Sequence, residues 1–151
     1  MNNIFNPDFL ELLACFNKHE VDYILIGGYS VVLHGYPRTT GDLDLWVRRD
    51  KENYNQIAVA FSCFQLPLFD MTLERFLDVD QFDVFRYGRP PVAVDIITKI
   101  KGVEFALAKS RMLKATFDGV NVNYISQQDL KATKIATGRP KDINDLENLG
   151  F

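Results

Sequence analysis

Two aspartates, Asp42 and Asp44, stand two positions apart in the segment Asp-Leu-Asp-Leu-Trp-Val. Side chains of a β-strand alternate between its two faces, so carboxylates at positions i and i+2 point to the same side. Carboxylate oxygens are the ligands that Mg²⁺ prefers, usually one or two from the protein with the rest from substrate phosphates and water. The pair therefore predicts a divalent-metal site for Mg²⁺ or Mn²⁺.

Asp95 is the candidate for a third carboxylate ligand. It lies in Val-Asp-Ile-Ile, an otherwise apolar run, and a carboxylate is costly to bury there unless it is paired or metal-bound. Three carboxylates could hold two metal ions that clamp the attacking and leaving oxygens of a phosphoryl group. Two alternatives stay open: Asp95 pairs with a base such as Arg86 across a hairpin, or Asp83 supplies the third ligand.

Gly27 and Gly28 follow an apolar run and precede the two aspartates. Glycines let the backbone turn sharply and approach a ligand closely, and amide N–H groups at a helix start attract phosphate. We therefore expect both glycines and the Ser30 hydroxyl to contact the phosphates of a nucleotide; the alternative is a tight turn without a ligand. The patterns G-x-x-x-x-G-K-[ST] and G-x-G-x-x-G are absent, which excludes a Walker loop and a dinucleotide fingerprint.

The elements that must position these residues follow from the hydrophobic pattern. It predicts one α/β (α+β) domain over residues 1–151, with a mixed β-sheet and helices packed against it. The expected strands are 21–26, 42–47, 82–87, 92–98, 112–117 and 120–125. The expected helices are 7–19, 30–34, 51–63, 72–77, 102–109, 127–137 and 140–149.

Composition agrees with a single folded domain. The chain has 151 residues, of which 47% are hydrophobic and 25% charged, so disordered and fibrous classes are excluded. No apolar run reaches the roughly 18 to 20 residues that cross a bilayer, and the N-terminus lacks a secretory signal pattern, so we expect a cytoplasmic protein. Cys15 and Cys63 form neither a metal-ligand spacing nor a disulfide framework and are predicted to be core thiols.

The spacing of the glycine pair and the aspartates resembles a known signature. Ile26-Gly27-Gly28, thirteen further residues and then Asp-Leu-Asp-Leu are similar to the DNA polymerase β-like nucleotidyltransferase superfamily. The resemblance implies a nucleotidyltransferase-like mixed sheet, a Gly-Gly turn that cradles a triphosphate, and Mg²⁺ bound by Asp42 and Asp44. The third carboxylate, on a later strand in that superfamily, falls on Asp95.

Two further segments narrow the resemblance. Residues 38–44, Arg-Thr-Thr-Gly-Asp-Leu-Asp, are similar to a segment of bacterial minimal nucleotidyltransferases, including abortive-infection toxins of toxin–antitoxin systems. Residues 129–146 resemble the closing Lys and Arg-x-Lys-Asp-x-x-Asp-Leu segment of the same proteins. For Arg38 the resemblance leaves two roles open, a triphosphate contact or a brace for the aspartate strand.

The closing segment implies nucleotide contacts from its bases. We expect Lys134 to bind the nucleotide or its phosphates, with Arg139 and Lys141 as further contacts, because lysine binds phosphate as a point charge. The alternative for Lys134 is a solvated helix face, with Lys131 as the phosphate-binding cation instead. The acids of the same segment, Asp142 and Asp145, are predicted to cap the last helix and to pair with Arg139 or Lys141.

Together these residues predict a metal-dependent transferase. It would move a nucleoside monophosphate from an NTP such as ATP to an acceptor hydroxyl of a protein, RNA or small molecule, and release pyrophosphate. One form of this expectation is the toxin of a toxin–antitoxin pair, with an antitoxin protein as partner. A hypothesis from another class is a nucleotide-binding or partner-binding module that keeps the fold without turnover. No membrane partner is expected.

Overall fold

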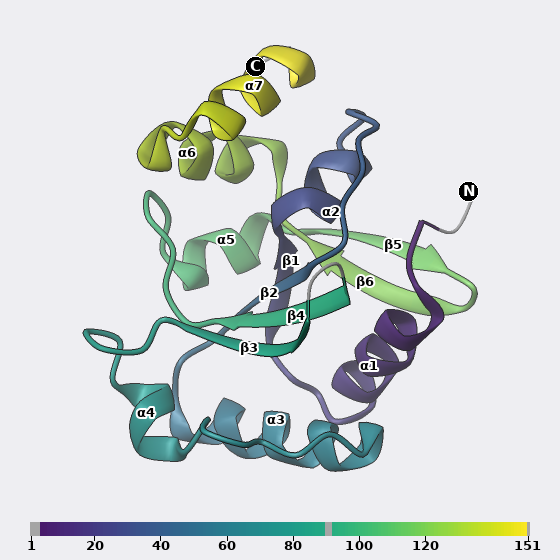
Figure 1. Cartoon of the computed structure of the whole chain (residues 1–151), viewed down its shortest axis with the longest axis vertical. Helices are drawn as coiled ribbons and strands as arrows, with labels where there is room; N and C mark the ends of the chain where they lie inside the picture. The colour runs from purple at the N-terminus through teal and green to yellow at the C-terminus, as the bar shows by residue number, and fades with distance from the viewer. Residues whose placement is uncertain (1–3, 90–91, 151) are drawn as a thin grey trace.

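The computed structural model describes residues 4–89 and 92–150 (Figure 1). Within these ranges the chain forms a six-stranded mixed sheet with helices on both faces, as predicted. The helices are α1 (Pro7–Lys18), α2 (Gly27–Leu33), α3 (Lys51–Phe64), α4 (Leu73–Leu77), α5 (Phe105–Arg111), α6 (Gln127–Thr137) and α7 (Pro140–Leu149). The strands are β1 (Tyr23–Ile26), β2 (Leu43–Val47), β3 (Val84–Arg89), β4 (Val92–Ile97), β5 (Leu113–Phe117) and β6 (Val120–Tyr124).

The strand order places the two functional segments side by side. The order is β3-β4-β2-β1-β6-β5. The pairs β1–β2, β3–β4 and β5–β6 are antiparallel, whereas β2–β4 and β1–β6 are parallel. Strand β2 therefore lies between β1, which leads into the glycine pair, and β4, which carries Asp95.

The alternation of side chains along β2 divides the core into two layers. Leu43 and Leu45 are fully buried in the larger cluster, which contains the apolar sides of α1 and α3. Trp46 faces the opposite side, in the cluster with Ala108 of α5 and Leu130 of α6. Figure 1 shows α1 and α3 on one side of the sheet and α5, α6 and α7 on the other. The aspartate side of β2 therefore faces the α5–α7 layer.

Helix α2 begins earlier than the sequence predicts. The expected range was 30–34, but the helix runs from Gly27 to Leu33. Gly27 adopts a φ of +71°, a conformation that glycine reaches without a steric penalty, so the chain turns directly from β1 into the helix. The Ser30 Oγ donates a hydrogen bond to the Gly27 carbonyl oxygen at 2.7 Å, which closes this first turn.

The prediction of two core thiols was wrong. Cys15 of α1 and Cys63 of α3 are joined in a disulfide, with their Cα atoms 6.0 Å apart, and Cys63 is exposed rather than buried. The two cysteines are 48 residues apart, and local sequence does not reveal which faces of two helices meet. No helix in the described ranges combines the length and apolar character needed to cross a membrane.

Candidate active site

The sheet brings Asp44 and Asp95 together. In the β2–β4 register the Cα of Asp44 is opposite the Cα of Asp95, and on its other side it is opposite Ile26 of β1. The two carboxyl groups share a hydrogen bond, and Asp95 is only 7% exposed. Asp83 lies outside β3 and is not registered with β2, although it lines the same cleft. The strand register therefore favours Asp95 over Asp83 as the partner of Asp44.

The environment of Asp44 disfavours its charged form. Burial raises the pKa of Asp44 to about 7, and the charge and hydrogen bond of Asp95 and the charge of Asp42 act in the same direction. The charge of Lys141 opposes this shift. Carboxylates that share one site repel each other, so one of them keeps its proton unless a cation neutralises the pair. Perturbed carboxyl groups of this kind are concentrated at functional sites.

The glycine pair is required by close packing against the aspartate segment. A Cβ atom on Gly27 would lie 2.0 Å from the Asp44 Oδ2, and one on Gly28 would lie 2.3 Å from the Thr40 Oγ1. The absence of a side chain at Gly27 therefore lets Asp44 lie against the start of α2, and the absence of one at Gly28 makes room for Thr40. This packing explains the two glycines without a ligand, and the Ser30 hydroxyl is buried and bonded to the Gly27 carbonyl. The phosphate contacts expected of Gly27, Gly28 and Ser30 remain a prediction.

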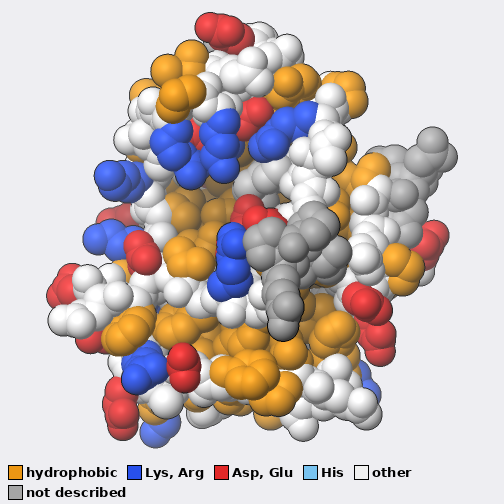
Figure 2. All heavy atoms as spheres, in the orientation of Figure 1, with side chains coloured by type: hydrophobic (Ala, Val, Ile, Leu, Met, Phe, Trp, Pro, Cys, Tyr) orange, Lys and Arg blue, Asp and Glu red, His pale blue; other side chains and the backbone are white. Residues whose placement is uncertain are grey.

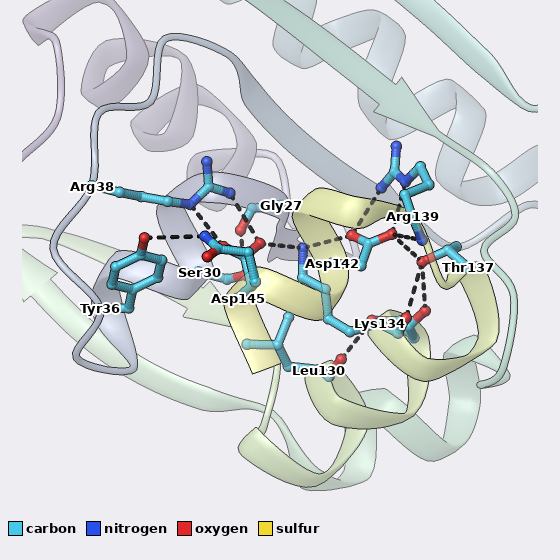
Figure 3. A network of polar contacts seen from close by, with 12 residues as sticks. Gly27, Ser30, Tyr36, Arg38, Leu130, Lys134, Thr137, Arg139, Asp142 and Asp145 are labelled. Atoms are coloured by element: carbon cyan, nitrogen blue, oxygen red, sulfur yellow. Dashed lines mark hydrogen bonds and ion pairs between the residues drawn. The ribbon is translucent and has the colours of Figure 1, made fainter. Parts of the chain in front are cut away.

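Lys134 of α6 and Arg38, which precedes β2, form ion pairs with acids of α7 (Figure 3). The Lys134 Nζ lies 3.0 Å from the Asp145 Oδ2 and 3.3 Å from the Asp142 Oδ1, and Lys134 is only 6% exposed. The Arg38 Nη2 donates to the Asp145 Oδ2 at 3.3 Å. Arg38 thus joins the segment before β2 to α7, and it also lines the cleft with Asp42 and Asp44, so both of its expected roles remain predictions.

Arg139 belongs to the same network, at the start of α7. The Arg139 Nε donates to the Asp142 Oδ2 at 2.8 Å, and the Thr137 Oγ1 donates to the same oxygen at 2.6 Å. Burial alone would raise the pKa of Asp142, but the hydrogen bonds from Arg139 and Thr137 and the charge of Lys134 hold it well below its usual range. The predicted capping role of Asp142 is confirmed, because its side chain also accepts the Arg139 backbone N–H.

A cleft of about 670 Å³ opens above the aspartates. This volume is typical of small-molecule sites. Acidic side chains lie at its centre and basic side chains gather above and beside them (Figure 2). The lining groups with charge are Asp42, Asp44, Asp83, Asp95, Asp142, Arg38, Arg86, Lys99, Lys101, Lys134, Arg139 and Lys141. A second hollow of about 300 Å³ beside β3 is lined by Asp70, Arg75, Arg86 and mostly apolar residues and holds no pair of acids.

Lys99 and Lys101 are cleft residues that the motif analysis missed. They follow β4 directly, so the strand that carries Asp95 also delivers two exposed cations to the same cleft. Lys141 is the third exposed lysine of the cleft, at the start of α7. The sequence did contain a signal for these two lysines, because they follow shortly after the predicted strand that carries Asp95.

The three aspartates are not drawn together as one metal-binding cluster. Across residues 4–89 and 92–150, no group of three or more His, Cys, Asp or Glu side chains is arranged to hold a metal ion. Arg86 lies among them, with its Nε 2.9 Å from the Asp95 Oδ1 and its Nη2 3.3 Å from the Asp42 Oδ2. The hydrogen-bonded pair of Asp44 and Asp95 still offers the one or two hard oxygen ligands that Mg²⁺ takes beside substrate phosphates.

Comparison with known proteins supports the fold. No protein-family model matches the sequence, and no curated protein matches it. TM1012 from Thermotoga maritima, a candidate nucleotidyltransferase, is similar in structure with a TM-score of 0.58 and 13% identity, over 97% of this chain and 94% of that one. ANT(2″)-Ia, solved in complex with adenylyl-2″-tobramycin, is similar with a TM-score of 0.52 and 14% identity, over 93% and 84%. The fold is nucleotidyltransferase-like.

Proposed function

We propose that this protein transfers a nucleoside monophosphate from an NTP to an acceptor hydroxyl, with Mg²⁺ or Mn²⁺ held at Asp44 and Asp95. The observation that carries the proposal is the pairing of Asp44 with Asp95 across β2 and β4, in a cleft that is also lined by several basic side chains. Two structures with the same fold are of proteins named as nucleotidyltransferases, which supports the class of reaction.

In the proposed reaction the acceptor oxygen forms a bond to the α-phosphorus, the bond from that phosphorus to the bridging oxygen breaks, and pyrophosphate leaves. The acceptor hydroxyl gives up its proton to solvent water in the same step. A divalent cation bound by the aspartates would neutralise charge on the phosphates and lower the pKa of the acceptor hydroxyl. Such transfers depend mainly on positioning and electrostatic stabilisation, which is what this chain's rigid strands and fixed charges supply.

The chain's own residues divide these tasks. Asp44 and Asp95, fixed by the strand register, orient the cation, and Asp42 adds a carboxylate at the open side of the cleft. Lys99, Lys101 and Lys141 are exposed at the cleft rim.

These three lysines are better placed to attract a polyphosphate than Lys134 and Arg139. Lys134 is buried against two carboxylates, and Arg139 is already paired with Asp142. The glycine pair lets the start of α2 approach the aspartates closely enough for a phosphate to contact both.

The test is transfer of label from an NTP labelled at the α-phosphate. Purified protein, Mg²⁺ and a cell extract are incubated with each of the four NTPs, and labelled protein, RNA and small molecules are separated. We expect Asp44→Asn to abolish labelling and Asp80→Asn, a matched change at an exposed aspartate outside the cleft, to leave it unchanged. Equal labelling by wild type and Asp44→Asn would refute the proposal.

A second candidate is a nucleotide-binding module without turnover. Arg86 favours it, because its guanidinium pairs with both oxygens of Asp95 and with Asp42. Calorimetry distinguishes the two: tight binding of an NTP with Mg²⁺, together with no pyrophosphate release in the presence of extract, would support the module.

A toxin role is the finer form of the proposal, supported by the similarity of residues 38–44 and 129–146 to minimal nucleotidyltransferases. Expression in a bacterial host tests it. We expect growth arrest that Asp42→Ala relieves and that co-expression of an antitoxin partner suppresses. Normal growth at a confirmed level of wild-type protein would argue against the toxin role and leave the transferase proposal standing.

A further inference from the structure

Arg86 occupies the place that a cation would take between two of the aspartates. Its Nε and Nη2 each lie 2.9 Å from one oxygen of Asp95, which is the bidentate geometry that guanidinium and carboxylate groups favour. The same Nη2 reaches the Asp42 Oδ2 at 3.3 Å. One guanidinium therefore bridges two carboxylates, that of Asp95 in β4 and that of Asp42 directly before β2.

The position of Arg86 comes from the sheet. In the antiparallel β3–β4 pair its Cα is opposite the Cα of Asp95, just as Asp44 is opposite Asp95 across β2–β4. Asp95 is thus flanked by a base on one side and an acid on the other. Because the register fixes both neighbours, Asp95 contacts Arg86 in the absence of any ligand.

The two partners of this contact differ in exposure. The Arg86 side chain is 46% exposed and belongs to β3, an edge strand, whereas the Asp95 side chain is 10% exposed. If the contact opens, we therefore expect the guanidinium to move into solvent and Asp95 to stay in place. Lys134 is the contrasting case, because it is buried between two carboxylates and can leave only if α6 and α7 separate.

We propose that Arg86 is the resident counter-ion of the carboxylate site, and that a divalent cation entering with a nucleotide displaces it from Asp95 and Asp42. The inference rests on the proposed function, because it assumes that these acids bind a cation. Arg86 is a positioning residue here: it holds the acids in place in the ligand-free chain and lowers their affinity for a metal ion that arrives alone.

The linkage between the two cations is reciprocal. A group that competes with the metal for the same oxygens must weaken metal binding by the factor by which the metal weakens its own pairing. Removing Arg86 should therefore tighten metal binding. If the role of Arg86 were purely structural, its removal should instead weaken metal binding, because Asp95 would be held less firmly.

The experiment measures Mn²⁺ binding without nucleotide, from the loss of the free Mn²⁺ signal in electron paramagnetic resonance. We expect Arg86→Ala to bind Mn²⁺ about tenfold more tightly than wild type. Arg86→Lys keeps the charge but loses the bidentate fork, so it should give a smaller gain. Lys141→Ala is the charge control: it removes a cation that acts on Asp44 at longer range, where solvent screens it, and should change binding least.

Each outcome decides the inference. Unchanged or weaker Mn²⁺ binding by folded Arg86→Ala overturns it, and so does an equal gain from Lys141→Ala, because general charge would then explain the effect. If neither wild type nor any variant binds Mn²⁺, the metal site of the proposed function fails as well.

A second measurement does not need Arg86→Ala, in case that variant does not fold. The Arg86 Nε–H resonance, identified by its absence from the Arg86→Lys spectrum, is followed while Mg²⁺ and a non-hydrolysable ATP analogue are added. We expect it to shift and to exchange faster with water. A shift of the Gly28 amide with an unchanged Arg86 resonance overturns the inference alone, whereas no shift at either position overturns the proposed function too.

Discussion

Two clusters of charged residues line the same cleft and differ in their balance of charge. The strand cluster, Asp42, Asp44, Asp95 and Arg86, has three acids and one base. The helix cluster, Asp142, Asp145, Lys134, Arg38 and Arg139, has two acids and three bases. The acids of the helix cluster are already neutralised by its bases. The strand cluster has more carboxylates than bases, and the surplus negative charge attracts a further cation.

Burial sharpens the contrast between them. In the helix cluster Asp142 and Asp145 are at most 1% exposed and Lys134 is 6% exposed, so this lysine is enclosed with its two acids, whereas the Arg139 side chain at the edge of the cluster is 58% exposed. In the strand cluster Asp95 is buried, but the Asp42 side chain is 35% exposed and that of Arg86 is 46% exposed. We therefore propose a structural role for the enclosed group of Lys134, Asp142 and Asp145 and a ligand-binding role for the strand cluster. The predictions below test this assignment through folding stability and activity.

The largest effect is expected at Lys134. Lys134→Ala leaves two buried carboxylates short of a partner, and breaking a buried ion pair from one side costs about 3 kcal/mol or more of unfolding free energy. Urea denaturation followed by circular dichroism measures the loss. Lys131→Ala, on the exposed side of the same helix, is the control and should change stability by less than about 0.5 kcal/mol. Equal losses of stability in Lys134→Ala and Lys131→Ala would contradict the structural role of Lys134.

Asp142 should give the protein a pH-dependent stability. Its pKa is lowered in the folded state, so it stabilises the fold above the ordinary carboxyl pKa near 4, and this contribution is lost as pH falls toward the folded value. We expect Asp142→Asn to lose about 2 kcal/mol at pH 7. The difference from wild type should shrink as unfolding is repeated below about pH 4. A difference that is constant with pH would contradict the prediction.

Asp44 should behave in the opposite way. Its pKa is raised by burial and by Asp95, so its charged form destabilises the folded chain when no cation is bound. At pH 8, Asp44→Asn is expected to raise the free energy of unfolding by about 1 kcal/mol, which a thermal unfolding experiment would detect as a higher Tm. The same variant should lose transferase activity. A clear loss of stability in this variant would make Asp44 a structural residue like Asp142.

Gly27 and Gly35 are expected to differ in their effect on metal binding rather than in their effect on stability. Gly27 and Gly35 both have positive φ, but a Cβ at Gly27 meets Asp44 whereas a Cβ at Gly35 meets nothing within 4 Å. Alanine at either position should cost about 1 kcal/mol of backbone strain. Only Gly27→Ala should also displace the Asp44 carboxylate and reduce Mn²⁺ binding. Equal Mn²⁺ affinities for the two variants would show that Gly27 does not position Asp44.

Much of the fold was predictable because it depends on local patterns. The alternation of Leu43 and Leu45 against Trp46 was predicted from the sequence pattern, and the structure confirms it, because these side chains lie in two different core clusters. The strands at 112–117 and 120–125 and the helix at 127–137 were likewise predicted from local patterns, and all three are present within a residue or two of the expected bounds.

The sequence named the candidate site residues but not their partners. The family resemblance implied that Lys134 and Arg139 contact the nucleotide, and the structure pairs both with acids of α7. The sequence left Asp95 with two exclusive choices, a metal or Arg86, whereas the structure gives it Asp44 on one side and Arg86 on the other. Which helix faces meet also decided the Cys15–Cys63 disulfide, which the sequence did not predict.

The sequence by itself determined which side chains share a face of a strand or helix, because side-chain direction follows the local backbone period. It therefore determined that Asp42 and Asp44 point to one side and that an acid interrupts the apolar strand at Asp95. Only the tertiary structure decided which charges neutralise one another, because strand register and helix packing set the distances between groups far apart in the chain. Those distances enclose Lys134 with its acids and leave Arg86 on an edge strand, where another cation can replace it.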